Sequence, residues 1–114
     1  MGLTTHVLDT AHGSPAAGMS FALFRAGESE ALVTGVTNAD GRSAGPLLHG
    51  ESFKPGAYAL RFEVAAYFRA RGVALPDPPF LDVVTLEFGI ADITAHYHVP
   101  LLVSPWSYST YRGS

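Results

Sequence analysis

Glycine and proline residues interrupt this 114-residue chain roughly every ten to fifteen residues, and no other feature of the sequence restricts its fold as strongly. The segments between these interruptions are rich in β-branched and aromatic residues, which favour strands. Short strands separated by turns at this spacing are typical of a β-sandwich. We therefore predict a mostly β fold in which residues 1–114 form a single domain.

The alternation of apolar and polar residues predicts where the strands lie. The strands are expected at residues 3–9, 19–25, 31–37, 57–65, 82–89, 94–103 and 106–112, with at most a short edge strand at 47–50. The segment AAYFRARG, at residues 65–72, consists of good helix formers and ends in glycine, which predicts one short helix. The ALPDPPF segment that follows holds three prolines and is expected to be an extended loop.

Side chains two residues apart on a strand share a face, and this rule groups the histidines. His6 shares a face with Thr4 and Leu8, and His96 shares one with His98. On the last strand one face carries Ser107, Ser109, Tyr111 and Gly113. We expect one face of these strands to be rich in His, Ser and Tyr, and the opposite face to be more apolar. The candidate core positions are Val7, Phe21, Leu23, Leu60, Phe62, Val84 and Leu86.

Composition and charge exclude several classes of function. The net charge is −3 and no basic run occurs, so we expect no nucleic-acid partner. The chain has no cysteine, which excludes disulfides, thiol catalysis and thiolate metal sites. The N-terminus lacks the pattern of a signal peptide, and no apolar stretch is long enough to span a membrane. We expect a cytoplasmic protein with no membrane partner. The apolar share of 47% weakly favours an oligomer.

The segments that carry chemistry resemble those of the 5-hydroxyisourate hydrolases of the transthyretin-like family. The resemblance runs from about Leu3 to Ser114 and rests on THVLDTAHGSPA, NADGR, YFRARG, HYHVPLL, SPWSYST and the final YRGS. Transthyretin, a carrier with the same fold, shares the VLD, GSPA and SPxSYST segments, so these alone do not separate the two. The hydrolase pattern differs from that of transthyretin at His6, Arg42, His98 and the C-terminal residues 111–114. This chain matches the hydrolase pattern at these positions.

The resemblance implies a transthyretin-like β-sandwich of two four-stranded sheets with one short helix. It implies an enzyme that hydrolyses the small molecule 5-hydroxyisourate, an intermediate of urate degradation in purine catabolism, to 2-oxo-4-hydroxy-4-carboxy-5-ureidoimidazoline. It also implies that the reaction needs no cofactor and no metal. Finally, it implies a homotetramer, a dimer of dimers, with the sites in a channel between the dimers and residues of more than one subunit in each site.

The residue types suit the hydrolysis of an amide. Histidine can exchange a proton near neutral pH, so we expect His98, aided by His6, to position and deprotonate water. Arg42 is expected to bind the substrate and to stabilise negative charge on its carbonyl oxygen. Ser114, through its hydroxyl group and free carboxylate, is expected to orient the substrate, a histidine or the water. Tyr111, Arg112 and Gly113 are expected to contact the substrate. The sequence leaves open which histidine is the base.

Each of these residues also has an ordinary interpretation. A single His6 or Arg42 would usually be a solvated surface residue, and His12 and His49 are expected to be surface residues of loops. One alternative function is that of a transthyretin-like carrier, which binds a small ligand without catalysis. A second alternative is a metal-binding module, in which His96 and His98 ligate a metal ion with His6 as the third ligand.

Overall fold

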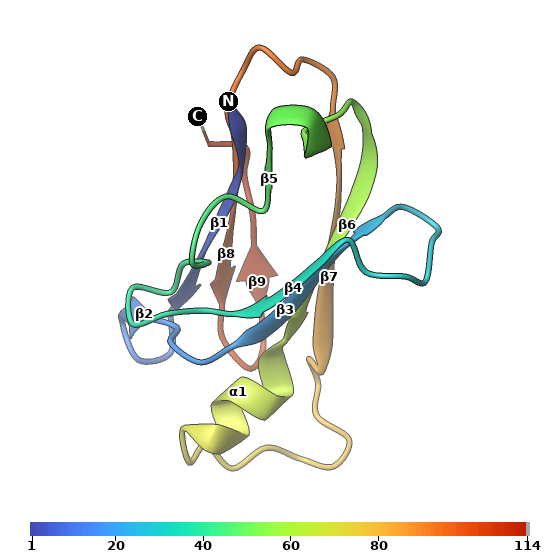
Figure 1. Ribbon diagram of the computed structural model, residues 1–114. Coiled ribbons are helices and arrows are strands. Elements are labelled where there is room, and N and C mark those ends of the chain that lie inside the picture. The colour runs from blue at the N-terminus through green and yellow to red at the C-terminus, as the bar shows by residue number, and fades with distance from the viewer. Residues whose placement is uncertain (114) are drawn as a thin grey trace.

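Two sheets packed face to face form the protein, as Figure 1 shows for a computed structural model that describes residues 1–113. The first sheet has the order β2 (Ser14–Pro15), β1 (Gly2–Asp9), β8 (Tyr97–Val103), β9 (Tyr108–Ser109), and β5 (Leu48–His49) also pairs with β1. The second has the order β4 (Val33–Val36), β3 (Ser20–Arg25), β6 (Gly56–Glu63), β7 (Val83–Ile90). The predicted mostly β sandwich with a single α-helix is therefore confirmed among these residues.

The first sheet has five strands, not the four that were expected. The reason is that two very short strands share one edge of β1. β5 pairs with Gly2 and Leu3 at the start of β1, and β2 pairs with Leu8 and Asp9 at its end. The other edge of β1 runs parallel to β8 over the register Leu3–Asp9 against Tyr97–Val103.

Helix α1 (Val64–Ala70) follows β6 directly and covers one end of the sandwich (Figure 1). The predicted strand at 57–65 is two residues too long. Its last two residues leave the sheet because the backbone N–H groups of Val64 and Ala65 both donate to the carbonyl oxygen of Asp82. The helix ends at Ala70, two residues before the predicted end, and the predicted terminator Gly72 follows with a φ of 82°. A 3-10 helix, η1 (Gly50–Ser52), was not expected.

The last strand is shorter than the predicted 106–112, since only Tyr108 and Ser109 form β9. The chain later returns to β8, and the backbones of Gly113 and His98 form an antiparallel bridge in the same register as β9. In this register the position opposite Tyr111 is Pro100. Proline has no N–H group to donate, so regular pairing is interrupted there.

The core lies between the two sheets, and every predicted core residue is at most 5% exposed. The alternation along β1 is also as predicted: Thr5 and Val7 are buried, whereas Thr4, His6 and Leu8 are partly exposed. On β8, Val99 and Leu101 are buried, and His98 faces the partly exposed side. The period-2 pattern of the sequence thus directs the histidines away from the core.

A buried carboxylate ties the loop after β1 to the helix. Asp9 is 1% exposed, and it accepts hydrogen bonds from the Tyr67 hydroxyl at 2.7 Å and from Nδ1 of His12 at 2.6 Å. Burial alone would raise the pKa of Asp9, but these hydrogen bonds outweigh it and hold the pKa below its usual value. His12 lies on the surface as expected, yet its ring has this structural role, which the Asp-x-x-His spacing could have indicated.

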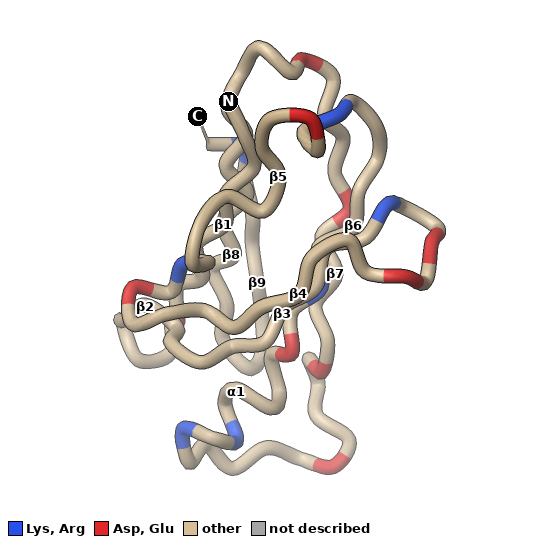
Figure 2. Tube along the Cα trace, viewed as in Figure 1, with Lys and Arg blue, Asp and Glu red and all other residues tan. Residues whose placement is uncertain are grey.

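Charged residues of both signs are interspersed along the described chain, mostly in loops and at the ends of strands (Figure 2). Among residues 1–113, no helix is long and apolar enough to cross a membrane.

Candidate active site

The outer edge of β1 is left open for a short distance, and this opening becomes a cavity. The segment after β4 meets β1 at Arg42, whose backbone forms an isolated bridge with His6. It rejoins β1 at Leu47, which donates to the carbonyl oxygen of Leu3. Between these two points the segment bows away from Thr4 and Thr5, so that the middle of the strand borders open space.

A tight turn places Arg42 beside His6. The side chain of Asn38 accepts hydrogen bonds from the backbone N–H groups of Asp40 and Arg42. Gly41 has a φ of 76°, and a Cβ atom there would lie 2.4 Å from the carbonyl oxygen of Val7. Only glycine combines this backbone conformation with so close an approach to β1. The NADG sequence therefore fixes the position of Arg42 in the first sheet.

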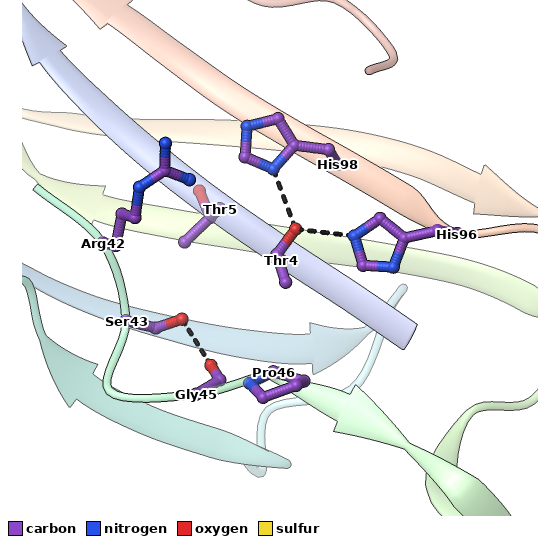
Figure 3. Close-up of a pocket in the computed structure, with 8 residues that line it drawn as sticks. All are labelled: Thr4, Thr5, Arg42, Ser43, Gly45, Pro46, His96 and His98. Carbon is purple, nitrogen blue, oxygen red and sulfur yellow. Dashed lines mark hydrogen bonds between the residues drawn. The ribbon is translucent and has the colours of Figure 1, made fainter. Parts of the chain in front are cut away.

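The cavity has a volume of about 530 Å³ and is lined by Thr4, Thr5, Arg42, Ser43, Gly45, Pro46, His96 and His98 (Figure 3). Arg42 and His98 had been predicted as site residues. Sequence reasoning did not place Thr4 in the site, although its position two residues before His6 on the same face could have indicated it.

Thr4 lies between two imidazole rings, as Figure 3 shows. Its Oγ1 atom is 2.8 Å from Nδ1 of His98 and 3.0 Å from Nε2 of His96. Within residues 1–113, Nε2 of His98 has no hydrogen-bond partner, so it is the ring nitrogen that can interact with a bound molecule. The predicted pairing of His96 and His98 on one side is confirmed, although His96 precedes β8.

The surroundings of His98 lower its pKa below the ordinary value of 6.5. Burial is the largest cause, because it disfavours the charged ring, and the positive charge of Arg42 and the nearby His6 and His96 act in the same direction. The lowered pKa favours the neutral form of His98, which has a lone pair available to accept a proton.

Replacing Arg42 with Gln is expected to raise the pKa of His98, because a positive neighbour that disfavours the imidazolium is removed. Burial remains, so the pKa is expected to stay below 6.5. An NMR titration of the His98 ring measures the shift, and Arg71→Gln, outside the cavity, is the matched control. A pKa that is unchanged in Arg42→Gln but raised in Arg71→Gln would contradict the assignment.

His6 is held differently from His98. Its Nε2 atom lies 2.8 Å from the carbonyl oxygen of Asp40, and since a carbonyl only accepts, Nε2 carries the proton. The ring is close enough to His98 to influence its pKa, although it does not line the cavity wall. The structure thus brings three of the predicted residues together: His6, Arg42 and His98.

The C-terminal tail reaches this group through Gly113. The backbone N–H of Gly113 donates to the backbone carbonyl oxygen of His98 at 2.7 Å. The carbonyl oxygen of Gly113 accepts from the backbone N–H of His98 at 3.2 Å. A Cβ atom at position 113 would lie 3.0 Å from Cδ2 of the His98 ring, which is too close for an undisturbed side chain. Glycine at this position therefore lets the tail lie against the imidazole.

Arg112 and Tyr111 lie elsewhere. The guanidinium of Arg112 stacks over the Tyr97 ring at 4.3 Å and donates to the carbonyl oxygen of His96 at 3.4 Å. Tyr111 lines a second cavity of about 400 Å³, between β7 and the tail, and is absent from the lining of the first. The predicted site residue Ser114 lies outside the described residues.

Within residues 1–113, no three His, Asp or Glu side chains come together in an arrangement that could hold a metal ion. One ring nitrogen of each histidine near the cavity is already hydrogen-bonded. The Thr4 hydroxyl bonds to one nitrogen of His96 and one of His98, and the backbone carbonyl of Asp40 accepts from one nitrogen of His6.

Comparisons with known proteins reveal close relatives over the full length. The sequence profile of the HIUase/Transthyretin family matches residues 3–113. A 5-hydroxyisourate hydrolase of Ralstonia nicotianae is 60% identical over 114 residues, which cover 98% of this chain and 97% of that protein. The structure of an (S)-allantoin synthase superposes with a TM-score of 0.93 at 47% identity, covering 99% of this chain and 43% of that one. This chain thus spans less than half of that synthase.

The fold is also similar to that of a carrier. The structure of sea bream transthyretin in complex with thyroxine superposes with a TM-score of 0.84 at 29% identity, covering 99% of this chain and 95% of that one. The fold alone therefore cannot separate a hydrolase from a carrier, and the residues of the cavity have to decide.

Proposed function

The chain belongs to the HIUase/Transthyretin family, on the side of its 5-hydroxyisourate hydrolases, and we propose that it opens the ring of 5-hydroxyisourate by attack of water on a ring amide. The product would be 2-oxo-4-hydroxy-4-carboxy-5-ureidoimidazoline, in the degradation of urate. The observation that carries this proposal is that Arg42 and His98 line one cavity, with His6 beside both of them.

The lowered pKa of His98, and its Nε2 atom without a hydrogen-bond partner among residues 1–113, support this residue as the base. Nε2 takes a proton from water as the water oxygen attacks the carbonyl carbon of the ring amide. The positively charged Arg42 stabilises the negative charge that develops on the carbonyl oxygen. When the C–N bond breaks, the imidazolium of His98 returns the proton to the leaving nitrogen. Nε2 of His6 donates to the backbone carbonyl oxygen of Asp40, which leaves His6 to help His98 position the water.

The tail supplies the remaining proposed contacts. Gly113 lies against His98 and contributes backbone groups at the rim of the site. Ser114 remains a prediction for orienting the substrate, a histidine or the water. Tyr111 and Arg112 border the second cavity, so we expect them to reach substrate only where subunits meet.

We also propose a homotetramer, a dimer of dimers. β7 and β9 are edge strands of the two sheets, and both border the second cavity, so two unpaired edges lie on the same side of the sandwich. Tyr108 and Tyr111 on this side are 46% and 60% exposed, which is unusual for large aromatic residues in a lone subunit.

Light scattering on the purified protein at micromolar concentration tests the assembly. We expect a mass of about four chains, because paired edges and covered aromatic residues stabilise the oligomer. A monomer at that concentration would contradict the proposed tetramer.

The decisive test of the activity generates 5-hydroxyisourate from urate with urate oxidase and follows its ultraviolet absorbance. Added protein is expected to accelerate the decay of the signal. Tight binding of the compound without acceleration would instead indicate a carrier. Charge and imidazole groups in the cavity favour a polar ring over a hydrophobic ligand.

A further inference from the structure

The Thr4 hydroxyl group contacts two histidines but has only one proton to donate. It lies 2.8 Å from Nδ1 of His98 and 3.0 Å from Nε2 of His96. The hydroxyl can donate to one of these nitrogens and accept from the other. The direction of the two hydrogen bonds therefore decides which nitrogen of His98 carries the proton.

Only one of the two arrangements leaves His98 able to act as a base. If Thr4 donates to His96, then Nδ1 of His98 carries a proton and donates to Thr4, and Nε2 presents a lone pair to the cavity. If Thr4 donates to His98 instead, Nε2 must carry the proton of the neutral ring. Nothing else among residues 1–113 bonds to a ring nitrogen of His98 and so selects between these states.

We propose that Thr4 is a positioning residue that keeps His98 in the Nδ1–H form, and that His96 in its own Nδ1–H form accepts the Thr4 proton on Nε2 and so holds Thr4 in the direction this requires. The inference rests on the proposed function of His98 as the base. If Nε2 of His96 carried a proton instead, it would donate to Thr4. The single proton of Thr4 would then go to His98, and Nε2 of His98 would lose its free lone pair.

The charged and titratable groups around this unit come from three elements. His6 lies on β1, Arg42 lies on the segment that bows away from β1, and Arg112 of the tail donates to the backbone carbonyl of His96. The nearby positive charge of Arg42 disfavours a further positive charge at His98.

The first test compares Thr4→Val, which has nearly the same shape, with Thr4→Ser, which keeps the hydroxyl group. Nitrogen-15 NMR of the imidazole rings at about pH 8, where histidines are neutral, reports the tautomer. We expect the Nδ1–H form of His98 in the native protein and in Thr4→Ser, and a shift to the Nε2–H form in Thr4→Val.

The same variants separate positioning from binding in the activity assay. In Thr4→Val we expect kcat to fall about ten-fold or more while KM changes little, and Thr4→Ser to restore most of kcat. A native His98 in the Nε2–H form would overturn the proposal. So would a loss of kcat in Thr4→Val without a change of tautomer, since that result would mean a merely structural role.

The second test uses His96→Leu, which removes the acceptor for the Thr4 proton. Nitrogen-15 NMR is expected to show a larger share of the Nε2–H form of His98 in this variant, and kcat is expected to fall. A native tautomer of His98 together with native kcat in His96→Leu would overturn the role of His96. The NMR result needs no turnover, so failure of the proposed activity and failure of this inference are distinguishable.

Discussion

His98→Asn is expected to lower kcat for 5-hydroxyisourate hydrolysis by about a thousand-fold. The amide of Asn is similar in size to the near half of the imidazole, so it can still hydrogen-bond to Thr4. It cannot accept a proton near neutral pH, however, so the base proposed from the position and lowered pKa of His98 is lost. The ultraviolet assay with freshly generated substrate measures the loss.

The matched control is His49→Asn, the same substitution at an exposed histidine that does not line the cavity. It is expected to keep native turnover. Thermal unfolding should show that both variants remain folded, because neither histidine belongs to the apolar core. Near-native turnover in a folded His98→Asn protein would remove His98 from the mechanism.

Deletion of residues 112–114 is expected to lower kcat/KM by about a hundred-fold or more. The deletion removes both backbone hydrogen bonds between Gly113 and His98, and it removes the stacking of Arg112 on Tyr97. The imidazole then loses the segment that packs against it. The two sheets keep their core, so the melting temperature is expected to fall only slightly.

Gly113→Val gives an independent measure of the same contact. A Cβ atom there would lie 3.0 Å from Cδ2 and 3.1 Å from Cβ of His98, so either the ring or the tail has to move. We expect a loss of kcat/KM comparable to that of the deletion. Trp106→Ala, at an exposed position near the tail but outside both cavities, is the control and should keep activity. Unchanged turnover in the deletion variant would show that the tail has no part in the site.

The order of apolar, polar and glycine residues along the sequence determined the main features of the fold. Period-2 alternation on β1 and β8 predicted which side chains enter the core, and burial of Val7 and exposure of His6 follow that pattern. The position of the helix end followed from Gly72, since glycine tolerates a positive φ. Local rules of this kind depend on neighbours in the sequence, so they can be read without knowing the tertiary structure.

Features that depend on long-range pairing could not be read in this way. The length of the last strand depended on its register against Pro100, which is about ten residues away and lacks an N–H group. The five-stranded first sheet arose because two separate segments found different parts of one edge of β1. The role of His12 required the helix to bring Tyr67 to the same carboxylate.

The sequence by itself determined that the strands present histidines on their less buried face, and the resemblance of its motifs selected His6, Arg42 and His98. Only the tertiary structure decided that these residues meet. β1 and β8 are more than 80 residues apart in sequence, and their parallel pairing sets Thr4 beside His98. The gap between Arg42 and Leu47 along the edge of β1 then opens the cavity, and no local pattern of residues encodes such a gap.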